Sequence, residues 1–299
     1  MSRFVLLALL CLGLASPAQA GLKVFATLPE WGALARVIGA DSVTVFVATH
    51  ALQDPHHIEA RPSLIARARQ ADLVVANGAD LEVGWLPAVL SAAGNGPIQP
   101  GQPGYFEAAA QVALLEVPAR VDRADGDVHP AGNPHIGLDP HRLLAVGTAL
   151  HERMAALDPA QAAVYRANWS AFSARWQLAI ARWTERAAPL RGKAIVVHHT
   201  AYPYFTRWLG LTRAGALEAK AGVAPGSAHL AALRDALAGQ PVLAIVRPPY
   251  APEGPGQWLA GETGIPLLRL PTTVEQSVDE AGLTAWFDEL IDRLLAHRR

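Results

Sequence analysis

Short apolar runs alternate with longer segments of helical periodicity through most of this 299-residue chain. Compact apolar runs bounded by turn residues are typical of buried strands, whereas apolar positions three or four apart predict helices. The predicted strands span residues 22–27, 43–47, 73–76, 194–197, 242–246 and 267–270. The predicted helices span residues 31–38, 62–71, 81–93, 202–209, 228–237, 256–261 and 283–297. This alternating order indicates parallel sheets that are covered on both faces.

The longest helical pattern lies between two such series of strands and helices. No Gly or Pro occurs between Pro159 and Ala187, and large apolar residues recur there at steps of three or four. These residues are Tyr165, Trp169, Phe172, Trp176, Ile180 and Trp183. At a rise of 1.5 Å per residue the helix would be roughly 40 Å long, enough to back two lobes. We interpret its aromatic stripe as a core-facing side rather than as a ligand site.

The order of elements therefore predicts an α/β fold with two lobes. Each lobe would contain a mostly parallel sheet flanked by helices, and one long rigid helix would join them. The N-terminal lobe would comprise residues 21–158, the linking helix residues 159–188 and the C-terminal lobe residues 189–299. A chain of this length is sufficient for a hydrophobic core in each of two lobes.

The first twenty residues have the pattern of a cleavable export signal. Arg3 provides the positive start, residues 4–14 are apolar, and Ala18-Gln19-Ala20 fits a small-x-small cleavage site before Gly21. The apolar stretch is too short to span a bilayer, and no later stretch has the roughly 18 uncharged apolar residues that a membrane helix needs. We therefore expect an exported protein and exclude residues 1–20 from the fold.

Composition narrows the functional classes further. The formal net charge is −1, which gives no reason to expect nucleic-acid binding. The one cysteine, Cys11, lies inside the predicted signal, so the exported chain has no thiol for a disulfide or for metal binding. Leu9 and Leu10 precede Cys11 where a lipid-anchored start would have a small residue. Any metal site must therefore use imidazoles and carboxylates.

Histidines stand in three separate loop segments. An imidazole binds zinc through one neutral ring nitrogen, so three that converge make a first shell without any thiolate. The segments are Gln53-Asp54-Pro55-His56-His57, Asn133-Pro134-His135 and His198-His199-Thr200-Ala201-Tyr202. Two of them follow predicted strands, and ligands of open parallel sheets gather beyond the carboxyl ends of the strands. Because neighbours in an extended segment face opposite sides, we expect one histidine of each adjacent pair to bind.

The other histidines have simpler explanations. Those in predicted helices, in loops or near the terminus are His50, His151, His229 and His297. Asp139-Pro140 is typical of a helix start, so capping accounts for Asp139 and His141. His129 lies in the loop 122–133, and we interpret it as a surface residue in preference to a transient metal contact.

Three motifs together resemble a known family. They are Asp-Pro-His-His-Ile-Glu-Ala-Arg-Pro-Ser at 54–63, Asn-Pro-His-Ile-Gly-Leu-Asp-Pro at 133–140 and His-Thr-Ala-Tyr-Pro-Tyr-Phe at 199–205. In this order, and with the long helix and Pro-Gly-Ser-Ala-His-Leu at 225–230, the chain resembles the zinc and manganese solute-binding proteins of bacterial ABC importers (cluster A-I). The resemblance covers essentially the whole exported chain and is strongest to the zinc-binding branch.

The resemblance implies a set of metal ligands. It assigns His56, His135 and His199, and a histidine at the third position favours zinc, because manganese-selective relatives tend to have a carboxylate there. The fourth ligand is implied to be an acidic residue after the last strand, for which we choose Asp279. Glu275, Glu280 and water stay open as alternatives, and Asp279 would also suit the start of the last helix as a cap.

Two further details concern the surroundings of this site. Glu59 is a candidate to orient a ligand imidazole through its other ring nitrogen, although an exposed carboxylate beside Arg61 explains it equally well. The loop before His135 is short and lacks the long histidine-rich insertion of some zinc-binding relatives. We therefore expect any accessory capture of metal by this loop to be weak.

The resemblance implies a periplasmic carrier rather than an enzyme. Such a protein captures Zn²⁺ between its lobes and delivers it to an ABC permease in the inner membrane, which a cytoplasmic ATPase drives. It would act as a monomer, and the sequence leaves open whether a periplasmic metallochaperone loads it. The alternatives are a Mn²⁺ or Fe²⁺ carrier of the same fold, a surface adhesin and, from another class, a zinc hydrolase with three histidines and a water. No His-Glu-x-x-His string supports the hydrolase.

Overall fold

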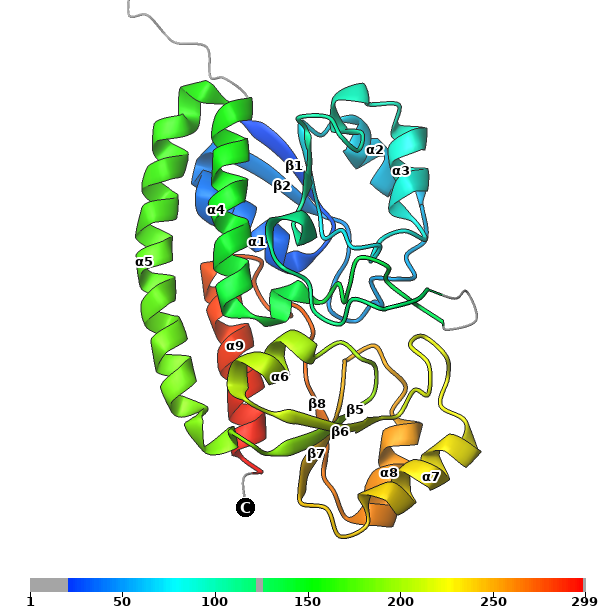
Figure 1. The fold of residues 1–299 in the computed structure, drawn as a ribbon. Coiled ribbons are helices and arrows are strands. Elements are labelled where there is room, and N and C mark those ends of the chain that lie inside the picture. Colours follow the sequence, from blue (N-terminus) through cyan, green and yellow to red (C-terminus); the bar gives the residue numbers. More distant parts are fainter. Residues whose placement is uncertain (1–20, 122–125, 298–299) are drawn as a thin grey trace, which may run out of the picture.

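The computed structural model describes residues 21–121 and 126–297, so the predicted export signal and part of the loop 122–133 lie outside the described residues. The described chain contains two four-stranded sheets in which every strand pairs in parallel (Figure 1). The first sheet, in the order β2-β1-β3-β4, consists of β1 (Leu22–Ala26), β2 (Val43–Val47), β3 (Leu73–Ala76) and β4 (Tyr105–Glu107). The second, in the order β6-β5-β7-β8, consists of β5 (Ala194–Val197), β6 (Thr212–Ala216), β7 (Val242–Arg247) and β8 (Leu267–Arg269).

All six predicted strands are present, and two further strands were not predicted. The central strand β3 is buried at every residue, which is why its continuous apolar run was recognisable. The missed strands, β4 and β6, are edge strands. One has only three residues and the other, Thr-Arg-Ala-Gly-Ala, is interrupted by a charge and a glycine, as is common at sheet edges.

Helices cover both faces of the two sheets. They are α1 (Pro29–Gly39), α2 (Pro62–Arg69), α3 (Leu86–Ala93), α4 (Pro140–Leu157), α5 (Ala162–Arg186), α6 (Pro203–Leu209), α7 (Ser227–Leu237), α8 (Gly254–Thr263) and α9 (Glu280–Leu295). The predicted start of α4 is confirmed, because Asp139 Oδ1 accepts the backbone N–H of His141 at 2.9 Å. The helix predicted for 81–93 begins only at Leu86, since Pro87 is tolerated in a first turn but not further inside a helix. In the described part of the chain, no helix combines the length and apolar character needed to cross a membrane.

The long helix α5 runs beside both lobes (Figure 1). It has 25 residues, hence a length of about 38 Å, and its aromatic stripe is buried as expected. Near its middle, the indole N–H of Trp176 donates to the carbonyl of Pro140 at 3.0 Å, which ties α5 to the start of α4. Near its end, the ring of Trp183 lies 5.1 Å from that of Phe287 on α9. The largest apolar cluster accordingly contains residues of both sheets, such as Val24 and Ile195.

Candidate metal centre

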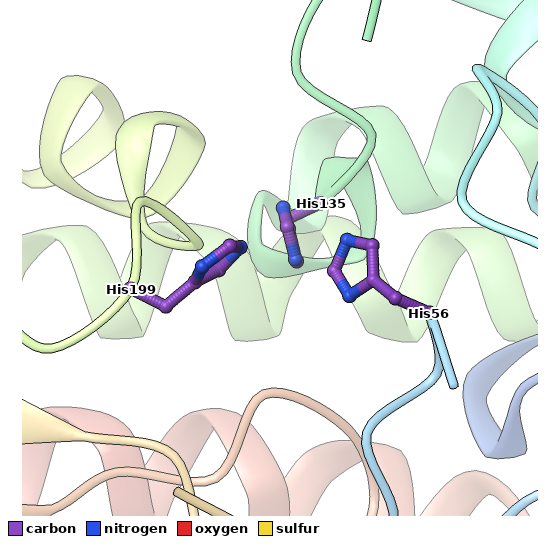
Figure 2. A group of neighbouring side chains, drawn as sticks. All are labelled: His56, His135 and His199. Atoms are coloured by element: carbon purple, nitrogen blue, oxygen red, sulfur yellow. The ribbon is translucent and has the colours of Figure 1, made fainter. Parts of the chain in front are cut away.

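His56, His135 and His199 converge where the two lobes meet (Figure 2). His56 lies between β2 and α2, His135 directly precedes the short 3-10 turn Ile136–Leu138, and His199 follows β5. One ring nitrogen of each lies within 4.8 Å of the others, and the described residues contain no other such group of histidines, cysteines or carboxylates. Their exposures are 7%, 9% and 6%, so all three are nearly excluded from solvent.

The ring spacing fits a single tetrahedral ion. Zinc binds an imidazole nitrogen at about 2.0–2.1 Å, and the ring centre lies about 1.1 Å further out, so two ligand rings should have centres about 5.2 Å apart. The observed separations are 5.5 Å for His56 and His135, 5.4 Å for His56 and His199, and 5.3 Å for His135 and His199. The three rings therefore already stand nearly at the distances that a shared zinc ion requires.

Each of these imidazoles uses its Nδ1 nitrogen within the protein. The pairs are His56 with Asp54 Oδ1 at 2.8 Å, His135 with Asn133 Oδ1 at 3.0 Å, and His199 with Glu218 Oε2 at 2.8 Å. The acceptors hold the proton on Nδ1 and leave the Nε2 lone pair available for a metal. The Nε2 atoms of His56 and His135 are buried and have no hydrogen-bond partner among the described residues.

One local turn presents two of the three histidines. In Asp54-Pro55-His56 and in Asn133-Pro134-His135, the first side chain also accepts the backbone N–H of the histidine, at 3.0 and 3.1 Å. Such an Asx turn fixes backbone and imidazole at the same time. Sequence reasoning missed this role of Asp54 and Asn133, although the repeated Asx-Pro-His pattern is a signal for it. Glu59, the expected candidate, is exposed.

Burial sets the protonation of the site. It lowers the pKa of His135 well below its usual value, and the nearby His199 and His56 lower it further. Burial also raises the pKa of Asp54, but the hydrogen bonds and charge of His56 outweigh this effect, so the pKa lies below its usual value. His135 is therefore neutral and Asp54 ionised at neutral pH, which are the forms that a metal ligand and its acceptor need.

The likeness to known proteins extends over nearly the whole described chain. A family model described as zinc-uptake complex component A, periplasmic (ZnuA), matches residues 24–296. The chain belongs to the ZnuA family. The high-affinity zinc uptake system protein ZnuA of Paracoccus denitrificans is 28% identical over 258 residues, which are 75% of each chain. The relationship to zinc and manganese solute-binding proteins, which the sequence motifs indicated, is thus confirmed.

Solved structures confirm the two-lobe fold. A crystal structure of ZnuA superposes with a TM-score of 0.76 at 22% identity, covering 92% of this chain and 99% of that one. FpvC from P. aeruginosa, solved with Ni²⁺, superposes with a TM-score of 0.73 at 23% identity, covering 93% of this chain and 97% of the other. Both structures therefore share the two-lobe architecture of this chain.

In this ZnuA-family protein, Asp279 does not join the three imidazoles. Its side chain is exposed and caps α9, where it accepts the backbone N–H of Gly282 at 2.9 Å and the hydroxyl of Ser277 at 2.6 Å. A carboxylate at a helix N-terminus satisfies free N–H groups and interacts favourably with the helix dipole. Asp279 thus has the capping role that was its alternative explanation.

The other two carboxylates of this loop are also engaged elsewhere. Glu275 pairs with Arg269, with one hydrogen bond at 3.0 Å, and Glu280 makes a two-pronged pair with Arg175 at 2.8 and 2.7 Å. Bidentate pairs of this kind are the stronger form of ion pair. A carboxylate from this loop would have to give up such a partner before it reached the imidazoles.

The other histidines of these loops differ in their exposure and in their distance from the three imidazoles. His57 is exposed and lies 3.7 Å from a carboxylate oxygen of Asp127, whereas His198 is buried with Nε2 at 3.6 Å from Glu218. Only one histidine of each adjacent pair stands in the group. His129, expected at the surface, instead has its ring centre 5.3 Å from that of His56. Burial, reinforced by His56, lowers the pKa of His129 to about 4.

Proposed function

We propose that this protein binds one Zn²⁺ between its lobes through His56, His135 and His199. It would deliver the ion to an ABC permease in the inner membrane, driven by a cytoplasmic ATPase. The observation that carries the proposal is the convergence of three buried imidazoles, each with Nδ1 paired to an acceptor. The name of the Paracoccus relative, a high-affinity zinc uptake system protein, supports the same cargo.

The ligand set favours zinc over manganese. Imidazole nitrogen suits ions of borderline softness such as Zn²⁺, whereas Mn²⁺ prefers carboxylate and water oxygens. The two carboxylates next to the imidazoles, Asp54 and Glu218, are each hydrogen-bonded to a ring nitrogen and act as its orienting partner. A carrier of Mn²⁺ or Fe²⁺ would need at least one of them to turn towards the ion.

The site suits retention of an ion rather than chemistry. A zinc hydrolase keeps one coordination position for water and places a general base beside it. Here Asp54 and Glu218 are occupied by imidazole N–H groups, and Glu30 and Glu82, which are also buried, bond to the hydroxyls of Thr273 and Thr27. We therefore propose that the protein is a carrier and not an enzyme. A zinc-dependent hydrolysis of model esters or peptides would contradict this.

Direct contacts couple the ligands across the lobes. The side-chain amide of Asn133, whose oxygen orients His135, donates to the carbonyl of Thr200 at 2.7 Å. The hydroxyl of Tyr204 donates in turn to the carbonyl of Asn133 at 2.5 Å. Separation of the lobes would break these bonds and pull His199 away from His56 and His135. A permease that opens the lobes would thus release the ion.

The place of action follows from the same proposal. The family is described as periplasmic, and residues 1–20 would direct export as a cleavable signal. We propose that the protein acts there as a monomer, since one chain supplies every ligand. A periplasmic metallochaperone that loads the site is compatible with this scheme but is not needed for it.

Competition titration of the purified protein with Zn²⁺ and Mn²⁺ tests the proposal. The wild type should bind one Zn²⁺ and prefer it strongly to Mn²⁺. His56→Ala, His135→Ala and His199→Ala should each weaken zinc binding severely. The matched controls His57→Ala and His198→Ala remove the neighbouring histidine of a pair and should change it little. Equal losses in the two groups would contradict the assignment.

A further inference from the structure

His129 is an unusual neighbour of the three imidazoles. Its ring centre lies 5.3 Å from that of His56, which equals the separation of His135 and His199. Both of its ring nitrogens are buried, and neither makes a hydrogen bond of good geometry in the described part of the chain. The backbone of Ala79 interacts with the ring and partly opposes the fall in the pKa of His129. Buried polar groups are nearly always paired, because desolvation without a partner is unfavourable. An imidazole that leaves two nitrogens unpaired beside a metal centre therefore requires an explanation.

Backbone hydrogen bonds fix the segment that carries His129. The backbone N–H of Asp127 donates to the carbonyl of Ala221 in the second lobe at 2.9 Å, and the N–H of Gly132 donates to the carbonyl of His129 at 3.0 Å. The approach to the second lobe is close, since a Cβ on Gly126 would lie 2.2 Å from the oxygen of Ala221. A hydrogen bond to the second lobe and a turn within the loop thus position His129.

The same contact reaches the partner of His199. Next to Ala221, the backbone N–H of Gly222 donates to Glu218 Oε2 at 2.9 Å, and this oxygen also accepts from His199. A Cβ on Gly222 would lie 2.0 Å from a carboxylate oxygen of Asp127, so the two segments approach closely there. The loop that carries His129 and the loop that carries Glu218, the partner of His199, therefore pack directly against each other.

Among the described residues, the carboxylates that were expected at the site or lie beside it are engaged elsewhere. Glu275, Asp279 and Glu280 are each engaged with an arginine or a helix N-terminus, as described above. Asp54 and Glu218 are held by the imidazoles that they orient. Among the described side chains, His129 lies next to His56 and has buried ring nitrogens that no hydrogen bond of good geometry engages. His129 is not one of the three histidines whose ring nitrogens lie within 4.8 Å of one another. Its side chain therefore has to rotate before it can reach an ion that the three share.

We propose that His129 is the fourth ligand, so that Zn²⁺ is held by four imidazoles. This inference rests on the proposed zinc-binding function and departs from the acidic fourth ligand that the sequence led us to expect. Four protein ligands fill a tetrahedral shell and leave no position for water, which suits retention. The two positive charges of the ion are balanced by Asp54 and Glu218, which contact the imidazoles from behind.

X-ray absorption at the zinc edge, on the full exported chain loaded with one equivalent of Zn²⁺, tests this assignment. The wild type should show four imidazole nitrogens and no oxygen ligand. His129→Ala and His129→Gln should each show three imidazoles with an oxygen donor in place of the fourth. Since removal of groups that merely orient a ligand lowers affinity about 10- to 100-fold, loss of a direct ligand should lower it at least tenfold.

Two controls make the outcome decisive. His57→Ala removes the other histidine that lies near Asp127, and the triple variant Glu275→Gln, Asp279→Asn, Glu280→Gln removes the acidic alternatives; both should retain four imidazoles and nearly wild-type affinity. Three imidazoles and an oxygen in the wild type, unchanged by His129→Ala, would overturn the inference and leave the zinc carrier intact. Failure of the wild type to bind Zn²⁺ at all would instead overturn the proposed function.

Discussion

At the scale of single residues, the three orienting acceptors of the imidazoles differ in charge. Asp54 and Glu218 are carboxylates, whereas Asn133 is an amide that also binds the carbonyl of Thr200. A carboxylate behind an imidazole raises its basicity as a ligand, and an amide fixes only its orientation. The charge on Asp54 should therefore contribute to zinc affinity separately from its Asx turn.

Asp54→Asn separates these two contributions. The amide oxygen can still accept from the backbone and ring of His56, as Asn133 does for His135, but the negative charge is lost. We expect zinc affinity to fall roughly tenfold, at the lower end of the effects found for such partners. The control Glu59→Gln removes an exposed carboxylate of the same segment and should have no effect. If the two variants behave alike, Asp54 does not tune the site.

The buried Glu30 predicts a dependence of stability on pH. Burial raises its pKa from 4.5 to about 7, although the hydroxyl of Thr273 partly opposes the shift. Between pH 4.5 and 7, the folded protein therefore keeps a proton on Glu30 that the unfolded chain has already lost. The stabilisation that this proton gives the folded state is fully present below pH 4.5 and is lost as the pH rises through 7. It amounts to about 3 kcal/mol.

Chemical denaturation with chelator present measures this effect. Between pH 4.5 and 7, the free energy of unfolding of the wild type should fall by about 3 kcal/mol relative to that of Glu30→Gln, which cannot titrate. A constant difference between the two proteins over this range would show that Glu30 is not protonated in the folded state.

The residues of the site were predictable to different degrees. His56, His135 and His199 were recognisable because each stands in a motif of fixed neighbours. The acceptor Glu218 was not, since it lies 19 positions after His199 and meets it only through the fold. The proximity of His129 to His56 also depends on how a loop packs between two lobes. Asp279 was chosen by resemblance alone, whereas its local sequence equally suited a helix cap.

At the scale of secondary-structure elements, α4 packs closely against the long helix α5. Gly147 on α4 lies beneath the indole of Trp169 on α5, and a Cβ there would come within 2.3 Å of a ring atom. Trp169 also stacks on His151, one turn further along α4, at 5.9 Å. The small residue at 147 therefore sets how closely the long helix approaches the first lobe.

Gly147→Ala should destabilise the protein by about 1–3 kcal/mol, because the indole or the helix must shift. The matched control is Gly261→Ala in α8, where an added Cβ meets nothing within 4 Å. That change should be neutral or stabilise by up to about 1 kcal/mol, since alanine is the better helix former. Denaturation midpoints of both variants test the pair, and equal effects would show that the contact does not constrain α5.

The elements themselves followed closely from the sequence. Buried parallel strands and amphipathic helices have strong patterns, so their order and type were predictable. The edge strands β4 and β6 were not predictable from the sequence. Each pairs with a neighbouring strand on one side only, and its residues are not continuously apolar. The late start of α3 depends on Pro87, which outweighs the apolar periodicity before it.

At the scale of the whole molecule, polar contacts and a shared core join the lobes. Arg36 on α1 donates to the carbonyl of Val278 at 2.9 Å, and Thr273 bonds to Glu30, so the loop before α9 lies against the first lobe. An ion bound by both lobes would add one more connection. Since the ligands come together only in the folded chain, zinc should stabilise the native state.

This stabilisation has a defined size. At a free Zn²⁺ concentration 100 times the Kd, the free energy of unfolding should rise by about 2.7 kcal/mol. The thermal midpoint should therefore increase with zinc in the wild type and much less in His199→Ala, the variant that removes the ligand of the second lobe. An equal increase in both proteins would indicate zinc bound elsewhere.

The most direct measurement is a crystal structure of the exported chain with one equivalent of Zn²⁺, with anomalous diffraction at the zinc edge. We expect a single anomalous peak between the lobes, at about 2.0–2.1 Å from the Nε2 atoms of His56, His135 and His199. A zinc peak elsewhere in the molecule, or no peak among these three imidazoles, would contradict it.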